Sequence, residues 1–284
     1  MSRYALGVDV TEAGATAVLV DREGTVGKHA TGAGDAALGR VLKQIGGPGA
    51  AESAGAAAEP ARHTAVRKAF AGRTPFVCRP GTAAITAETW VGSARGAGDA
   101  ICLWIGERVF AGVMLGGKPW AGAHGLAGSA AWLALNPVAR QDFRKFGSLA
   151  AEVSNSGIAR RLSWRIQSGD PSAVLERAGT LEAITAAHVF DGARDGDGVA
   201  ISVVRETAKY IAMAIANLAC TVDPEVIILA GGIADAGDLL MRPIAQECSR
   251  RLPPEMLTHF RLERSTLGPL GVAIGAAKLA AAAA

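Results

Sequence analysis

The chain has 284 residues, of which 50% are hydrophobic and 19% charged, and its formal net charge is +3. This length and apolar content suit one large α/β domain or two ordinary ones. No apolar run reaches the roughly 18–20 residues that cross a bilayer, and the basic residues are dispersed, which excludes a membrane partner and nucleic acid as the main partner.

The four cysteines stand singly, at Cys78, Cys102, Cys220 and Cys248. Without a CxxC pair they support neither a disulfide framework nor a cysteine-based zinc site. The residues after Met1 follow a strand pattern and do not form a signal peptide. We therefore expect a cytoplasmic protein.

The N-terminal third alternates strand and helix signals. Residues 46–60 (GGPGAAESAGAAAEP) are low in complexity and predict a flexible surface loop. Thr82 is the expected N-cap of a helix over 82–94. The other predicted elements are strands at 4–10, 15–20, 25–28 and 75–78, the last one buried, and helices at 36–45 and 65–71.

The remainder begins with a hairpin and is then mostly helical. Residues 148–221 have an almost entirely helical pattern, with Asp170 and Thr180 as expected N-caps. A buried strand at 225–230 leads into Gly231 and Gly232. The other predicted elements are hairpin strands at 100–105 and 109–115, a helix at 238–251, a strand near 260–262 and an Ala-rich helix from Gly271.

Five segments, taken in order, carry a family likeness. They are Leu6–Val10 with Ala17–Asp21, Gly122–Gly128, Glu152–Gly157, Asp223–Ile233 and Leu267–Ala277. Together they resemble the ROK family (repressors, open reading frames and sugar kinases) of the actin-like ATPase superfamily. The resemblance implies an α/β fold of two lobes, the actin-like ATPase (ribonuclease H-like) fold, with a shortened N-terminal lobe.

The resemblance also implies how the chain is divided and what the family does. The smaller lobe would span residues 1–97 and the larger one 98–284, with the terminal helix (about 271–284) packing back on the first lobe. The family transfers phosphate from ATP to a sugar hydroxyl, and its members form homodimers.

The nucleotide motifs are only partly present. The first phosphate turn, D-x-G-G-T-K in the family, is here Asp9–Gly14, which keeps the metal-associated Asp9. The second, G-T-G-x-G-x-G, is here Gly106–Gly112 and keeps only its outer glycines. The expected cofactor-binding residues are Asp9, Gly106, Gly231 and Gly232. Whether ATP with Mg²⁺ is the cofactor stays open.

The catalytic motif is changed at its central residue. The family's N-D-A-N-A-A run aligns with Arg79–Ala84, so Pro80 takes the place of the aspartate that accepts the sugar proton. No catalytic residue is assigned, and whether the protein is an enzyme is left open.

The sugar contacts and the zinc site also differ. In the family's A-G-E-x-G-H motif, the glutamate becomes Ser129 and the histidine becomes Trp132, while the later contact Glu152 is retained. The family's zinc-binding cysteines align with residues 143, 145 and 150, which are phenylalanine, lysine and alanine, so no metal site is expected.

These changes favour a protein that has lost kinase activity and binds another small ligand, one with a flat or hydrophobic part, in the cleft between the lobes. Three alternatives stay open: an ATP-dependent sugar kinase that uses unfamiliar residues, an enzyme of another reaction class, and an interaction partner of an active relative. The residues expected to line the cleft are Arg79, Trp104, Glu107, Arg108, His124, Trp132 and Glu152.

Overall fold

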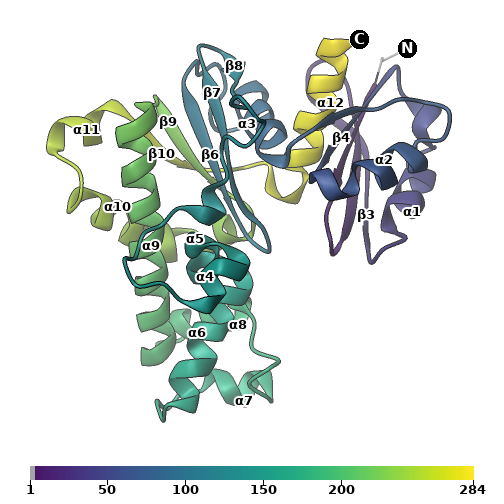
Figure 1. Ribbon diagram of the computed structural model, residues 1–284. Helices are drawn as coiled ribbons and strands as arrows, with labels where there is room; N and C mark the ends of the chain where they lie inside the picture. Colours follow the sequence, from purple (N-terminus) through teal and green to yellow (C-terminus); the bar gives the residue numbers. More distant parts are fainter. Residues whose placement is uncertain (1–3) are drawn as a thin grey trace. The chain divides into compact units, whose positions relative to one another are not determined.

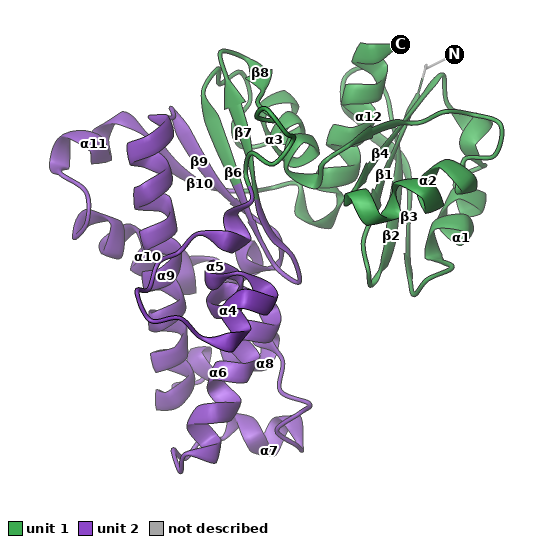
Figure 2. Cartoon of the chain, in the orientation of Figure 1, with its two compact units in different colours: residues 1–102, 111–128, 265–284 green, residues 103–110, 129–264 purple. Residues whose placement is uncertain are grey.

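The computed structural model describes residues 4–284, so the expectation for the chain start at Met1 lies outside the described residues. The chain divides into two compact units, which Figure 2 colours separately. Unit 1 comprises residues 1–102, 111–128 and 265–284, and unit 2 comprises 103–110 and 129–264. Within the described part of the chain, no helix is long and apolar enough to cross a membrane.

Unit 1 is built on a mixed sheet. Its strands are β1 (Ala5–Val10), β2 (Gly14–Val20), β3 (Val26–Ala33), β4 (Ser53–Ala58) and β5 (Phe76–Cys78). Their order is β3-β2-β1-β4-β5; the first three pair antiparallel, whereas β4 and β5 run parallel to β1. The early strand predictions are therefore confirmed.

Helices cover both faces of this sheet. They include α1 (Ala37–Gln44), α2 (His63–Ala69), α3 (Pro80–Trp90) and α12 (Gly271–Ala283). Successive residues of a strand point to opposite faces. Leu6 and Val8 accordingly pack in the core with α1 and α2, whereas Ala5 packs in a second core with Ile274 of α12. Figure 1 shows α12 lying along β4.

The structure overturns the prediction that residues 46–60 form a flexible loop. Ser53–Ala58 form β4, a fully buried strand between β1 and β5. A Cβ atom on Gly55 would lie 2.0 Å from the carbonyl oxygen of Ala276 in α12. Because the helix backbone comes this close, only very small residues fit, and the low complexity reflects tight packing.

The segment around α3 corrects two further expectations. Phe76 in β5 is 39% exposed because β5 is the edge strand, so this strand is not buried as predicted. The helix starts at Pro80 instead of being capped by Thr82. Proline suits a first helical position because the missing N–H is not needed there and its φ is already helical.

The second sheet follows the order β10-β9-β6-β7-β8, and β6 and β7 contribute residues to both units. Its strands are β6 (Ala100–Ile105), β7 (Val109–Leu115), β8 (Lys118–Pro119), β9 (Val226–Ala230) and β10 (Arg261–Arg264).

The remaining helices belong to unit 2. They are α4 (Gln141–Phe146), α5 (Ser148–Val153), α6 (Asn155–Gln167), α7 (Val174–Ala178), α8 (Ala186–Arg194), α9 (Gly198–Val222), α10 (Asp238–Ser249) and α11 (Pro254–His259). The predicted helical stretch at 148–221 is confirmed. Figure 1 shows α9 and α10 side by side.

Two predicted helix caps in unit 2 are wrong. The Asp170 carboxylate pairs with Arg165, and α7 begins after Ala173. The cap of α8 is Thr185, whose hydroxyl accepts from the backbone N–H of His188 while the His188 ring accepts from the Thr185 N–H. Thr180 instead accepts a hydrogen bond within its own turn.

The close contact between β4 and α12 makes Gly55 a test of the fold. We predict that Gly55→Ala lowers the free energy of unfolding by about 1–3 kcal/mol, because the added methyl group meets the Ala276 carbonyl in a packed interior. Urea unfolding measures this change.

Gly39→Ala is the matched control, because a Cβ atom there, on α1, has nothing within 4 Å. We expect its stability to stay the same or to rise by up to about 1 kcal/mol. Equal losses in both variants would contradict a specific contact between β4 and α12.

Candidate functional site

The first candidate residue, Asp9, lies in the middle of the unit 1 sheet. It is 6% exposed and pairs in register with Thr16 on β2 and Ala57 on β4. Burial, with the Asp9 charge as the second cause, raises the pKa of the Cys78 thiol to about 12. Cys78 therefore stays protonated at neutral pH and is no nucleophile.

The turn after Asp9 is closed by its own hydrogen bonds. The Thr11 N–H donates to the Gly14 carbonyl, and the Gly14 N–H donates to the Thr11 hydroxyl. A Cβ atom on Gly14 would lie 2.0 Å from the Gly32 carbonyl oxygen on β3. The packing of β2 against β3 thus accounts for this glycine without a phosphate.

The start of α3 presents no proton acceptor at the position that the resemblance gives to the catalytic base. Pro80 is buried there, and the preceding Arg79 forms an ion pair with Glu59 at 3.0 Å. Further along the helix, burial raises the pKa of Glu88, against hydrogen bonds from Ser265 and Ser93 that lower it. These bonds give Glu88 a structural role within unit 1.

Three of the predicted glycines come together in unit 2. A Cβ atom on Gly231, whose φ is +83°, would lie 2.4 Å from the Ile105 carbonyl oxygen, and one on Gly106 would lie 3.4 Å from the Gly232 nitrogen. The position of Gly231 requires a residue without a side chain, whereas the contact at Gly106 is an ordinary van der Waals distance. The predicted residues Gly106, Gly231 and Gly232 therefore form one backbone surface.

Aromatic and polar side chains hold the turn that follows Gly106. The Trp104 and Phe110 rings stack with centroids 5.7 Å apart, and the Arg108 guanidinium lies 5.3 Å from the Phe110 centroid. The Asn155 side chain donates to the Glu107 carboxylate at 3.0 Å. The sequence predicted Trp104, Glu107 and Arg108 as ligand contacts, and in the structure these three have contacts within or next to the Gly106 turn.

A cavity of about 590 Å³ opens beside these glycines, and we call it the glycine cavity. The lining includes the apolar residues Ile184, Ala187 and Phe190 together with the carboxylates of Glu107, Asp191 and Asp235 and the amide of Asn155. Glu107 and Gly232 are the predicted site residues that line it. The full lining is Glu107, Asn155, Ser156, Ala159, Ile184, Thr185, Ala186, Ala187, Phe190, Asp191, Arg194, Gly232, Asp235 and Ala236.

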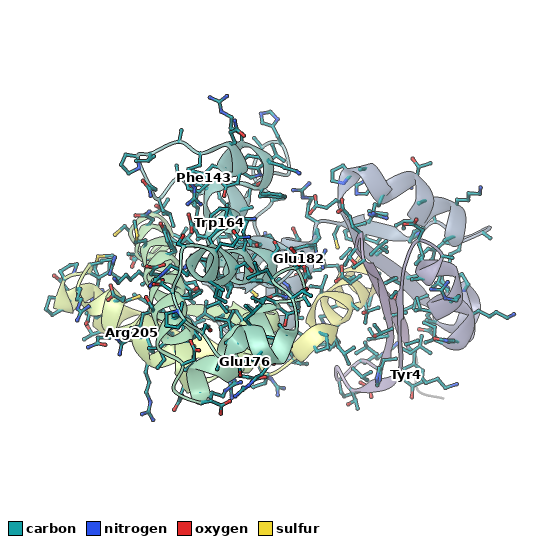
Figure 3. All side chains as sticks on the ribbon, turned by 90° about the horizontal axis from the view of Figure 1, so that it is seen from below. Tyr4, Phe143, Trp164, Glu176, Glu182 and Arg205 are labelled. Carbon is teal, nitrogen blue, oxygen red and sulfur yellow. The ribbon has the colours of Figure 1, made fainter. Side chains whose placement is uncertain are left out.

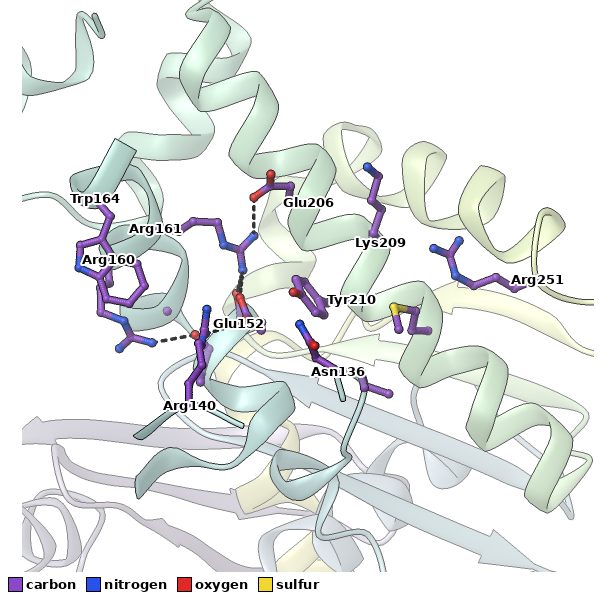
Figure 4. Close-up of a pocket in the computed structure, with 14 residues that line it drawn as sticks. Asn136, Arg140, Glu152, Arg160, Arg161, Trp164, Glu206, Lys209, Tyr210 and Arg251 are labelled. Atoms are coloured by element: carbon purple, nitrogen blue, oxygen red, sulfur yellow. Dashed lines mark hydrogen bonds and ion pairs between the residues drawn. The ribbon is translucent and has the colours of Figure 1, made fainter. Parts of the chain in front are cut away.

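Glu152 lies in a different part of unit 2. Its side chain is 5% exposed and accepts hydrogen bonds from Arg140 at 2.5 Å and from Arg161 at 2.9 Å. It borders a second cavity, of about 440 Å³, which we call the arginine cavity (Figure 4). The predicted residue Trp132 is 58% exposed and lines neither cavity, and His124 in unit 1 is also exposed.

Comparison with known proteins identifies the family. Residues 69–283 match the ROK family. This chain belongs to that family. A glucokinase from Halalkalibacterium halodurans is 32% identical over 183 residues, 64% of this chain and 56% of that enzyme. A glucokinase from Thermotoga maritima is 27% identical over 209 residues, 73% of this chain and 66% of that enzyme. The matched region thus spans less than two thirds of either relative.

Solved structures share the fold. A ROK glucokinase from Streptomyces griseus, in complex with glucose and AMPPNP, has a TM-score of 0.84 at 24% identity and covers 98% of this chain and 99% of its own. A ROK transcriptional regulator homologous to the E. coli MLC protein has a TM-score of 0.81 at 21% identity and covers 99% and 78%. The predicted two-lobed α/β fold of the family is therefore confirmed.

In this ROK protein, rings and ion pairs occupy the segment where the resemblance places zinc ligands. The described residues contain no cluster of histidine, cysteine and carboxylate side chains that could hold a metal ion. The Arg140 guanidinium lies 4.3 Å from the Phe143 centroid and 6.0 Å from that of Trp164. Figure 3 shows these two rings in the same part of unit 2.

No sequence motif assigned a role to the residues around Glu152. Arg160 and Arg161 fit the exposed face of a helix, but both are only partly exposed and bind carboxylates, Arg160 to Asp142 at 3.3 Å. A retained glutamate eight positions before a double arginine was the available signal. This spacing could not show which of the two arginines binds the glutamate.

The buried carboxylate provides a test of this network. We predict that Glu152→Gln lowers the free energy of unfolding by about 3 kcal/mol, because it leaves Arg161 with too little compensating charge in the interior. Glu206→Gln is the control: Glu206 is 42% exposed and 3.7 Å from Arg161, so its loss should change stability by less than about 0.5 kcal/mol. Chemical denaturation compares both with wild type, and a neutral Glu152→Gln variant would refute the buried network.

Proposed function

We propose that this ROK protein binds a purine nucleotide in the glycine cavity of unit 2 and transfers phosphate to sugars slowly or not at all. The single observation that carries the binding proposal is the cavity beside the Gly106 and Gly231–Gly232 turns. At about 590 Å³ it has the size of a small-molecule site.

The lining suits a flat base joined to polar groups. Ile184, Ala187 and Phe190 offer an apolar wall for the ring, and apolar walls with few polar groups are typical of such sites. Carboxylates such as Asp235 can accept hydrogen bonds from ribose hydroxyls or an exocyclic amine. Gly232 has no side chain, so a phosphate can approach its backbone closely.

The proposal of weak turnover rests mainly on the missing proton acceptor at position 80 in unit 1. Pro80 stands where the family has the aspartate that takes the sugar proton, and proline has no acceptor atom in its side chain. Loss of a general base typically slows a reaction about 10²–10⁴-fold. In unit 2, Glu152 is engaged by two arginines, which leaves it less able to bind a sugar hydroxyl.

The small ligand that we propose in place of sugar has a flat or hydrophobic part. Ser129 and Trp132 replace a glutamate and a histidine of the family motif, and the Trp132 ring is 58% exposed. An exposed indole offers a face for stacking where the family offers carboxylate and imidazole.

A second candidate function is an ATP-dependent sugar kinase. The observation that favours it is that relatives 27% and 32% identical to this chain are glucokinases. In this case a group other than a residue at position 80 would accept the sugar proton.

The nucleotide proposal can be tested by thermal unfolding with Mg-ATP. We expect wild type to be stabilised, by about 2.7 kcal/mol at a ligand concentration of 100 times Kd. Ala187→Trp, which fills the glycine cavity from its exposed edge, should abolish the shift. Ala183→Trp, on an exposed residue outside the lining, should retain it. If ATP gives no shift, or the same shift in all three proteins, the glycine cavity is not the nucleotide site.

Glucose-dependent ADP release distinguishes the two candidate functions. We expect wild-type turnover far below the roughly 1–100 s⁻¹ of kinases. Pro80→Asp, which places a carboxylate at the first turn of α3, should raise it if the base is the main missing group. Wild-type turnover within the kinase range would establish the second candidate and overturn the first.

A further inference from the structure

We propose that the arginine cavity of unit 2 is a binding site for a small oxyanion-bearing metabolite, whose phosphate or carboxylate group is held by Lys209, Arg251 and Tyr210. The cavity measures about 440 Å³ and shares no lining residue with the glycine cavity. The proposal therefore stands independently of nucleotide binding. Figure 4 shows the side chains that line it.

Positive charge dominates the lining. The cationic side chains are Arg140, Arg160, Arg161, Lys209 and Arg251, against the carboxylates Glu152 and Glu206. Asp142 and Glu247, just outside the lining, each bind two arginines of this region and offset part of the excess. Among residues 4–284, Lys209 is the cation of this lining that has no carboxylate partner, whereas Arg251 pairs with Glu247 through one terminal nitrogen and keeps the other available.

Within the described residues, the protein leaves several hydrogen-bond donors of Lys209, Tyr210 and Arg251 without partners. Among residues 4–284, neither the Lys209 ammonium nor the Tyr210 hydroxyl has a hydrogen-bond or ion-pair partner. Arg251 binds Glu247 through only one of its terminal nitrogens. Figure 4 shows Arg251 extending toward Lys209, with Tyr210 on the same helix as Lys209.

The opposite wall is fixed in place. Arg161 is held by Glu152 and lies 5.5 Å from the Tyr210 centroid, while Arg160 lies 5.2 Å from that of Trp164. The buried Nε–H of Arg160 has no partner in the described part of the chain. A site whose groups are already ordered loses little freedom when a ligand binds.

This donor set selects the chemical class of the ligand. Ammonium and guanidinium groups are donors without acceptor capacity, and they form short, charge-assisted bonds with phosphate and carboxylate. The carboxylates Glu152 and Glu206 are both paired with Arg161, so they leave few acceptors for a neutral sugar. The hydroxyl groups of a neutral polyol can also accept hydrogen bonds from these donors, but only an oxyanion forms charge-assisted bonds and compensates their positive charge.

The test is calorimetric titration of the whole protein at fixed ionic strength with inorganic phosphate, citrate and uncharged glucose. We expect saturable binding of phosphate or citrate, and whichever binds more tightly identifies the oxyanion. Lys209→Met should weaken that binding by about tenfold or more, because a charge-assisted bond is lost. Tyr210→Phe should weaken it without changing the net charge.

Arg205→Met is the matched control. Arg205 lies one turn earlier on α9 (Figure 3), is exposed and does not line the cavity, yet its loss changes the net charge by the same amount. Its affinity should equal that of wild type. Absence of phosphate and citrate binding by wild type, or equal weakening in Lys209→Met and Arg205→Met, would overturn the proposal. An Mg-ATP shift that persists in Lys209→Met would show that the two cavities act separately.

Discussion

The packing of unit 1 depends on α12, whose backbone lies in direct contact with the backbones of β1, β4 and α3. Cβ atoms on Gly7, Gly55 and Gly275 would lie 1.9, 2.0 and 1.8 Å from carbonyl oxygens of residues packed against them. At this separation side chains are excluded at the contact positions, which is why glycine stands there, and β4, α3 and α12 are rich in glycine and alanine. The scarcity of large side chains is thus a packing requirement, and it holds in place the strand that carries Asp9 and the helix that begins at Pro80.

This contact also explains which elements the sequence predicted and which it did not. β1 and β2 carry valine and leucine at strand spacing, so the local pattern and the tertiary structure agree. Residues 53–58 are serine, alanine and glycine, which have weak strand propensity, and only their neighbours make them a strand. The predicted starts of α3 and α8 were also wrong. α3 begins at Pro80 without a capping side chain, whereas α8 is capped by Thr185 and not by Thr180.

The candidate sites also divide into residues that the sequence predicted and residues that it did not. The glycines at 106, 231 and 232 were predicted from their motifs, and at 231 the close contact with the Ile105 carbonyl and the positive φ explain why glycine is required. The pairing of Glu152 with Arg140 and Arg161 has no such motif, since charged residues on a helix are usually solvated. Unit 2 thus combines the turns at Gly106 and Gly231–Gly232 with a cavity lined by five cationic side chains, which no motif predicted. The two cavities differ in chemistry, one suited to a flat base and the other to an oxyanion.

The division of unit 1 into three chain segments has a consequence for how it folds. One face of its sheet is covered by Gly271–Ala283, whereas β1 starts at Ala5. During synthesis, the ribosome makes nearly the whole chain before that cover exists. Contacts between residues so far apart in sequence form slowly. The nascent strands β1 and β2 therefore present an uncovered face with Ala5, Val18 and Val20 until α12 is made, and in that interval a chaperone can protect them.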